Sequence, residues 1–100
     1  MKSIETFAFV SHHEPSSIQI ATINSERAVQ PHFSINFSCF LDENATFTDK
    51  ILNCDSINAL ASHITQCLRA NESKTMTILK EFNNTDNQQE KIKLLETLEN

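Results

Sequence analysis

A regular alternation of hydrophobic and polar residues marks the middle of the first half of the chain. The apolar positions are Phe33, Ile35, Phe37, Cys39 and Leu41, and the positions between them are His32, Ser34, Asn36, Ser38 and Phe40. Alternation with a period of two predicts a strand with one face in the core and the other in water. Residues 4–10 and 18–23 are rich in β-branched and aromatic residues, and a polar break with Pro15 separates them. These two stretches therefore predict two further strands that form a hairpin.

The second half of the chain carries helical spacing. Apolar residues recur on one face between residues 55 and 70, which predicts a helix with Asp55 as its N-cap. The apolar stripe is Ile57, Leu60, Ala61, Ile64 and Leu68. Asp86 and Gln89 match a capping box, so a second helix is expected from there to about Glu99. Residues 75–82 are predicted as a strand between these helices, and residues 45–48 as a short additional strand.

The order of these elements predicts an α+β fold. It runs β-β-β-(β)-α-β-α, and it favours an antiparallel sheet of about four strands with two helices on one face. One hundred residues suffice for one core, so residues 1–100 are expected to form a single domain.

Composition excludes several classes of function. The chain contains no glycine, which phosphate-binding loops, dinucleotide fingerprints and nucleophile elbows all require. A net charge of −5 argues against nucleic-acid binding, and no apolar run reaches the ~18 residues of a membrane span. Three cysteines without a secretory signal are expected to be reduced thiols in a cytoplasmic protein.

Two groups of residues could carry chemistry but favour a structural interpretation. His63 and Cys67 lie four residues apart on a predicted helix, which suits half a zinc site or a thiol beside a base. No further ligand pair accompanies them, so we expect no metal. His12, His13 and His32 could run acid–base chemistry on a ribose phosphate, but adjacent strand residues point to opposite faces and the segment around His12 has no cation until Arg27. The segment around His12 and His13 is therefore predicted to be a loop. The sequence therefore predicts no catalytic residues and no cofactor.

An acidic stretch follows the alternating segment and is the stronger candidate for a binding site. Asp42, Glu43, Asp49 and Asp55 are opposed only by Lys50, a local charge of −3 that would steer a basic partner toward the chain. Since Trp and Tyr are absent, Phe40 or Phe47 would supply the apolar anchor. The predicted partner-binding residues are Asp42, Glu43, Asp49, Phe40 and Phe47. The uncharged Ser- and Asn-rich face of the third strand also suits a protein partner or another strand edge.

In size, acidity and lack of motifs, the chain is similar to immunity proteins of bacterial toxin systems, including contact-dependent inhibition systems. Phage anti-CRISPR proteins are similar in the same way, and no motif transfers residue roles from either group. We expect a non-catalytic inhibitor that occludes a basic toxin domain, such as a nuclease. Three alternatives stay open: an anti-CRISPR-type inhibitor, a structural subunit that self-associates through the third-strand edge or the last helix, and an enzyme without a recognisable motif.

Overall fold

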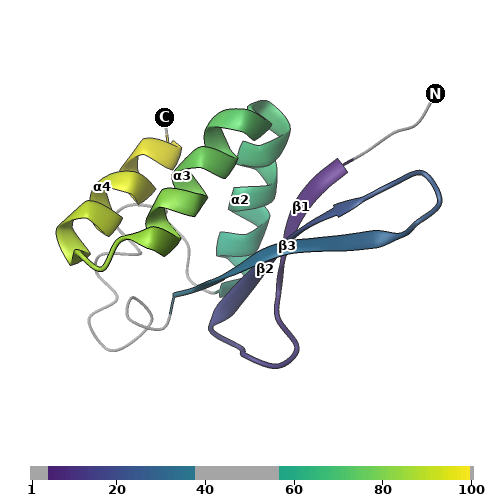
Figure 1. Cartoon of the computed structure of the whole chain (residues 1–100), viewed down its shortest axis with the longest axis horizontal. Coiled ribbons are helices and arrows are strands. Elements are labelled where there is room, and N and C mark those ends of the chain that lie inside the picture. Colours follow the sequence, from purple (N-terminus) through teal and green to yellow (C-terminus); the bar gives the residue numbers. More distant parts are fainter. Residues whose placement is uncertain (1–4, 38–56, 100) are drawn as a thin grey trace.

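The computed structural model describes residues 5–37 and 57–99, which form a sheet followed by helices (Figure 1). The strands are β1 (Glu5–Val10), β2 (Ser17–Ile23) and β3 (Val29–Asn36). The helices are α2 (Ile57–Ala70), α3 (Glu72–Asn84) and α4 (Gln88–Glu99). The described residues therefore form an α+β fold of the order β-β-β-α-α-α, a compact globule with a radius of gyration of 13.4 Å.

The sheet is antiparallel, with the strands in the order β1-β2-β3. Val10 pairs with Ile18 and Ser17 with Asn36, so the predicted hairpin of the first two strands is confirmed. The β2–β3 turn has to form without glycine. The Asn24 side chain accepts hydrogen bonds from the amides of Glu26 and Ala28, and Arg27 takes a left-handed φ of 65°. An Asx turn thus replaces the glycine that a tight hairpin would use.

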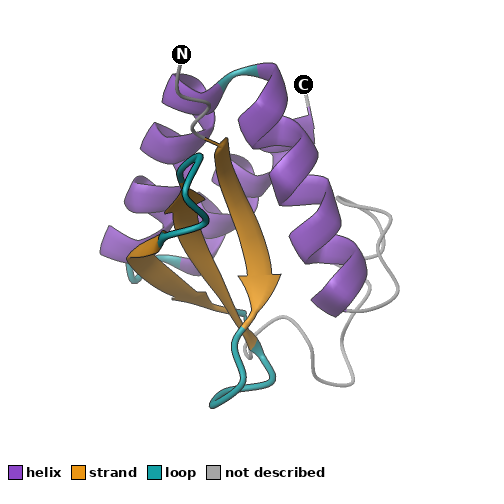
Figure 2. Cartoon of the chain, turned by 90° about the vertical axis from the view of Figure 1, so that its right-hand side faces the viewer, coloured by secondary structure: helices purple, strands orange, loops and turns teal. Residues whose placement is uncertain are grey.

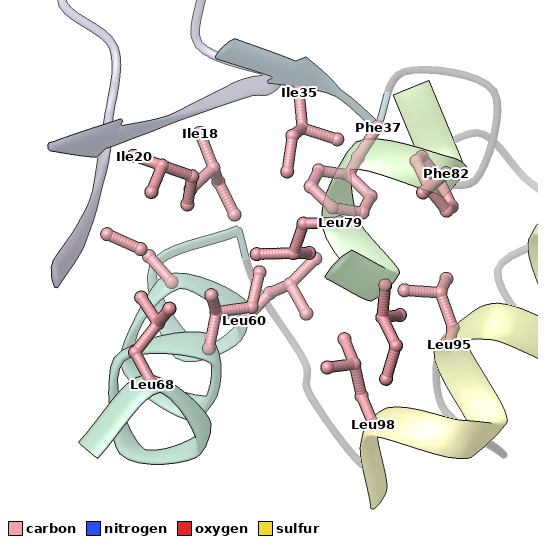
Figure 3. Close-up of a cluster of buried hydrophobic side chains, with 14 residues drawn as sticks. Ile18, Ile20, Ile35, Phe37, Leu60, Leu68, Leu79, Phe82, Leu95 and Leu98 are labelled. Carbon is pink, nitrogen blue, oxygen red and sulfur yellow. The ribbon is translucent and has the colours of Figure 1, made fainter. Parts of the chain in front are cut away.

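The three helices lie on the same side of the sheet, and Figure 2 turns the opposite side toward the viewer. Helix α2 lies directly on β1 and β2, and α3 and α4 pack beyond it. The predicted apolar stripe of α2 is confirmed, because Leu60, Ala61, Ile64 and Leu68 are all buried. Figure 3 shows the core that results, in which Phe37 and Phe82 meet with ring centroids 5.2 Å apart. Phe33, Ile35 and Phe37 face this core as the alternation predicted.

The prediction of a strand over residues 75–82 is wrong, since this segment lies within α3. Its buried residues are Thr75, Ile78, Leu79 and Phe82. These follow helical spacing, and packing them against the core outweighs the strand preference of the β-branched residues. The described part of the chain accordingly has three strands and three helices. The predicted short strand at residues 45–48 lies outside the described residues.

The caps of the later helices come from asparagines. Asn71 caps α3, and its side-chain oxygen accepts a hydrogen bond from the Lys74 amide. The prediction that Asp86 caps the last helix is wrong by one residue, because the Asn87 side chain accepts from the Glu90 amide at 3.0 Å. This register places Glu90 at the third helical position, where an acidic side chain complements the helix dipole. The predicted N-cap Asp55 lies outside the described residues.

The Thr65 hydroxyl fastens the free edge of β1 to α2. It accepts a hydrogen bond from the Ala8 amide at 2.9 Å and lies within donating distance of the Ala61 and Ala8 carbonyls. Thr65→Val keeps the shape but leaves the amide of Ala8 without its partner, so the free energy of unfolding should fall by about 1–3 kcal/mol. Urea denaturation measures the loss, with Thr97→Val on the exposed side of α4 as the control. Equal midpoints for the two variants would contradict this role for Thr65.

Candidate functional site

The five residues predicted to bind a partner, Asp42, Glu43, Asp49, Phe40 and Phe47, lie outside the described residues. Their role therefore stays a prediction. Within residues 5–37 and 57–99, the candidate site is a different surface.

That surface is the side of the sheet turned away from the helices, which we call the outer sheet face. Its apolar residues are Phe7, Phe9, Ala21, Ile23, Val29 and Pro31. Alternation along β1 places Phe7 and Phe9 here because Ala8 between them belongs to the core. In the part of the chain that the structure describes, the core cluster includes none of these six residues. The protein thus carries a second apolar surface on a face that the described helices leave open (Figure 2).

Local contacts hold the outer sheet face in shape. The rings of Phe7 and Phe9 stack with their centroids 5.4 Å apart. The strand register sets Ala21 between Phe7 and Pro31, and Ala21 is completely buried. Val29, the first residue of the edge strand β3, is 50% exposed. A β-bulge in the β2–β3 pairing sets the register from Ala21 onward, so it fixes where Val29 and Pro31 lie.

A shallow groove of about 190 Å³ crosses this side of the molecule. It is lined by Phe9, Ser11, His12, His13, Gln19, Val29 and Pro31. The predicted break between the first two strands is confirmed, because His12 and His13 lie in the β1–β2 loop, and both line this groove. There the Ser11 hydroxyl accepts hydrogen bonds from the amides of His13 and Glu14. His32 does not line this groove, and its ring nitrogen is hydrogen-bonded to the Thr22 hydroxyl.

The charges of the sheet region are predominantly acidic. Residues 5–37 contain the three glutamates Glu5, Glu14 and Glu26, the single cation Arg27 and no lysine, which gives a net charge of −2 with neutral histidines. Glu14 accepts a hydrogen bond from the Ser17 hydroxyl, and Glu26 lies in the turn that Asn24 fixes. Glu5 pairs with Arg69 of α2, but both side chains are about half exposed or more, so this ion pair adds little stability.

Side chains engage both edges of the sheet. Thr65 bonds to the backbone of Ala8 on β1, and the Asn83 amide donates to the Ser34 carbonyl on β3 at 2.9 Å. Pro31 removes one amide hydrogen from β3. These features hinder the addition of a further strand. They weaken the alternative in which the chain self-associates through the third-strand edge.

His63 and Cys67 do come together, but in a structural arrangement. The Cys67 sulfur lies 3.6 Å from the His63 Nε2 and 3.5 Å from the Leu98 carbonyl, to which it donates. Burial raises the pKa of the Cys67 thiol, and the nearby Lys74 ammonium offsets only part of this rise. The thiol is thus protonated at neutral pH, whereas a catalytic cysteine needs a lowered pKa. Cys67 links α2 to the end of α4.

An open pocket of about 300 Å³ adjoins this pair between α2, α3 and the end of α4. Its polar residues include Gln66, Asn71 and Lys74. Among the described residues, no group of three or more His, Cys, Asp and Glu side chains is placed to hold a metal ion.

Alkylation tests the state of Cys67. In a Cys39→Ser, Cys54→Ser background, iodoacetamide should modify Cys67 several-fold more slowly than a small model thiol near neutral pH. Because the thiolate is the reactive form, a raised pKa shifts the rate profile toward higher pH. Mass spectrometry at several pH values follows the reaction. A rate above that of the model thiol would identify an activated cysteine and contradict the structural role.

Comparisons with known proteins give no further identification: no family model, curated protein or solved structure matches this chain. No helix in the described ranges has the length and apolarity that a bilayer crossing needs. The described residues define an α+β protein whose outer sheet face carries partly exposed apolar side chains beside the polar pair Gln19 and Ser34, with no described helix over it.

Proposed function

We propose that this chain is a small non-catalytic inhibitor that binds a basic protein and occludes it, in the manner of immunity proteins that neutralise bacterial toxins. The observation that carries the proposal is the outer sheet face, where Phe7, Phe9, Ile23, Val29 and Pro31 form an apolar surface with no helix of the described part over it.

The composition of this face favours a partner over free exposure to water. An antiparallel sheet with helices on one side ordinarily presents polar side chains on the other. Here two stacked phenylalanines and a half-exposed valine lie on the solvent side instead. Covering apolar surface contributes roughly 25 cal/mol per Å², which makes such a face a source of binding free energy. Contiguous apolar patches rimmed by polar residues are typical of protein-interaction sites.

The chemistry of the other candidate groups supports a non-catalytic role. Cys67 has a raised pKa and donates to a backbone carbonyl, so it is not prepared for nucleophilic attack. His12 and His13 line a groove that lacks lysine and arginine, and a phosphate substrate would need such cations. The sequence contains no glycine, so the catalytic motifs that require glycine are absent from it.

The acidic stretch supplies a second expected contact region. Asp42, Glu43 and Asp49 would attract a basic partner, with Phe40 or Phe47 as an additional anchor. A nuclease toxin suits this chemistry, since its own active site has to be basic to hold phosphate. Inhibition would then be steric and electrostatic, and it would require no covalent step.

The proposal is tested by capture followed by an activity assay. The tagged chain is expressed in its native host, washed at low and then at high salt, and the eluate is identified by mass spectrometry. We expect one stoichiometric basic protein, weakened by salt, whose enzymatic activity falls when the purified chain is added back. Recovery of the bait alone as a multimer would favour the subunit alternative, and a partner that stays fully active while bound would contradict inhibition. The partner's identity separates a toxin from a target of anti-CRISPR type.

A further inference from the structure

Building on the proposed function, we infer that the partner binds the outer sheet face with a surface rich in lysine and arginine. The partner's surface presents one aliphatic or aromatic side chain, which enters the groove beside Phe9, Val29 and Pro31.

The groove has the dimensions for a side chain. Its volume of about 190 Å³ lies below the ~300 Å³ at which small-molecule sites begin. Its walls include an aromatic ring, a valine and a proline, which give apolar contact, whereas Gln19 and the two loop histidines add polar groups at its border. Interfaces commonly place an apolar anchor in such a depression and surround it with polar residues.

Charge determines which kind of partner fits. Glu14 lies in the loop at one end of the sheet and Glu26 in the turn at the other, and both are exposed. Residues 5–37 have a net charge of −2, and Arg69 of α2 pairs with Glu5, which leaves Glu14 and Glu26 as the remaining acidic groups, the latter next to Arg27. The two exposed glutamates would repel those of a second copy and attract a cationic surface.

Area sets how much of the surface any partner has to cover. Strands of six to eight residues, spaced by roughly 4.8 Å and rising about 3.4 Å per residue, make a sheet face of about 300–400 Å². A stable interface needs about 800 Å² from each partner. A partner on this face therefore has to reach over the two loops as well, where it meets Glu14 and Glu26.

Binding to the face is favoured over strand addition at an edge. The Thr65 hydroxyl is hydrogen-bonded to the backbone of β1, and the Asn83 side chain is hydrogen-bonded to the backbone of β3. Pro31 has no amide hydrogen to offer a further strand beside β3. The stacked rings of Phe7 and Phe9 are, in contrast, already fixed in one arrangement, so little side-chain entropy is lost when a partner covers them.

A pair of neighbouring substitutions tests the inference against the protein captured by the tagged chain. Val29→Lys puts a cation on the outer sheet face, and Gln30→Lys makes the same change one residue later on β3, where the side chain points to the other face. Both positions are exposed, so both variants should fold, which circular dichroism verifies. We expect Val29→Lys to weaken the affinity at least 30-fold and Gln30→Lys to change it less than three-fold.

The charge component is measured with the double variant Glu14→Gln, Glu26→Gln. Its association rate should fall several-fold at low salt and converge with the wild-type rate at high salt.

The possible results separate this inference from the proposed function. If a partner is captured and Val29→Lys binds it as tightly as Gln30→Lys does, the outer sheet face is not the site, and the binding function stands. If Val29→Lys instead converts a homodimer into monomers, a second copy of the chain binds the outer sheet face, and the inference is overturned. If no variant and no wild-type chain captures a partner, the proposed function fails and this inference fails with it.

Discussion

Replacing Phe82 with alanine is expected to lower the free energy of unfolding by about 3–5 kcal/mol. Phe82 is 1% exposed, and its ring lies 5.2 Å from that of Phe37, centroid to centroid. The substitution removes buried apolar surface and leaves a cavity where α3 meets the residue that follows β3. Because domains of this size are stable by only about 5–15 kcal/mol, such a loss removes a large fraction of the free energy of unfolding.

Urea denaturation followed by circular dichroism measures this effect. Glu81→Ala, an exposed change on the same helix, is the control and should alter stability by less than about 0.5 kcal/mol. A double-mutant cycle with Phe37→Leu isolates the ring–ring contact, which should couple by about 0.5–1.5 kcal/mol. Similar midpoints for Phe82→Ala and Glu81→Ala would show that Phe82 does not join α3 to the sheet.

A proline at position 77 is expected to cost about 3 kcal/mol or more. Thr77 lies in the interior of α3, where its amide belongs to the helical hydrogen-bond ladder and its hydroxyl donates to the Ser73 carbonyl. Proline removes that amide hydrogen and clashes with the preceding turn. The helical signal at 222 nm should fall together with the urea midpoint.

Two further variants make this a test of helix against strand. Glu72→Pro places proline at the first helical position, after the extended cap residue Asn71, where it should be tolerated. Thr77→Ala should raise stability slightly in a helix, whereas it would lower stability in a strand, because threonine favours strands and alanine favours helices. A loss of stability in Thr77→Ala, with Glu72→Pro as damaging as Thr77→Pro, would contradict the helical assignment.

The sequence predicted most of the described elements of this fold, and the largest failure has a physical cause. The alternation of Phe33, Ile35 and Phe37 and the stripe of α2 follow patterns that burial on one face imposes, so the structure confirms them. Residues 75–82 contain β-branched and polar residues that suit a strand locally. Their helical spacing was also present, with Asn71 in position to cap it, but only packing against the core decides between the two patterns.

The candidate site was harder to predict because it depends on how elements combine. Phe7 and Phe9 lie on one face of β1 and Ala8 and Val10 on the other, so both faces carry apolar residues, which can be recognised in the sequence. That the phenylalanine face is left uncovered by the described helices becomes evident only once all of them are found on the other side of the sheet. The convergence of His12 and His13 on one groove depends on a loop conformation that strand alternation does not describe.

The acidic stretch stays a prediction from the sequence. Asp42, Glu43 and Asp49 lie outside the described residues, so their contribution to binding is tested by charge reversal rather than by geometry. An Asp42→Lys, Glu43→Lys, Asp49→Lys variant that folds and binds as tightly as the wild type would remove the electrostatic role of this stretch.

The central claim is that the open apolar face of the sheet is the binding surface, and methyl NMR tests it most directly. Ile, Leu and Val methyl groups are labelled, and spectra are recorded with and without the captured partner. The account predicts that the resonances of Ile23 and Val29 shift or broaden, whereas those of Ile92 and Leu94 on α4 stay in place. Perturbation of the α4 methyl groups, with Ile23 and Val29 unchanged, would contradict it.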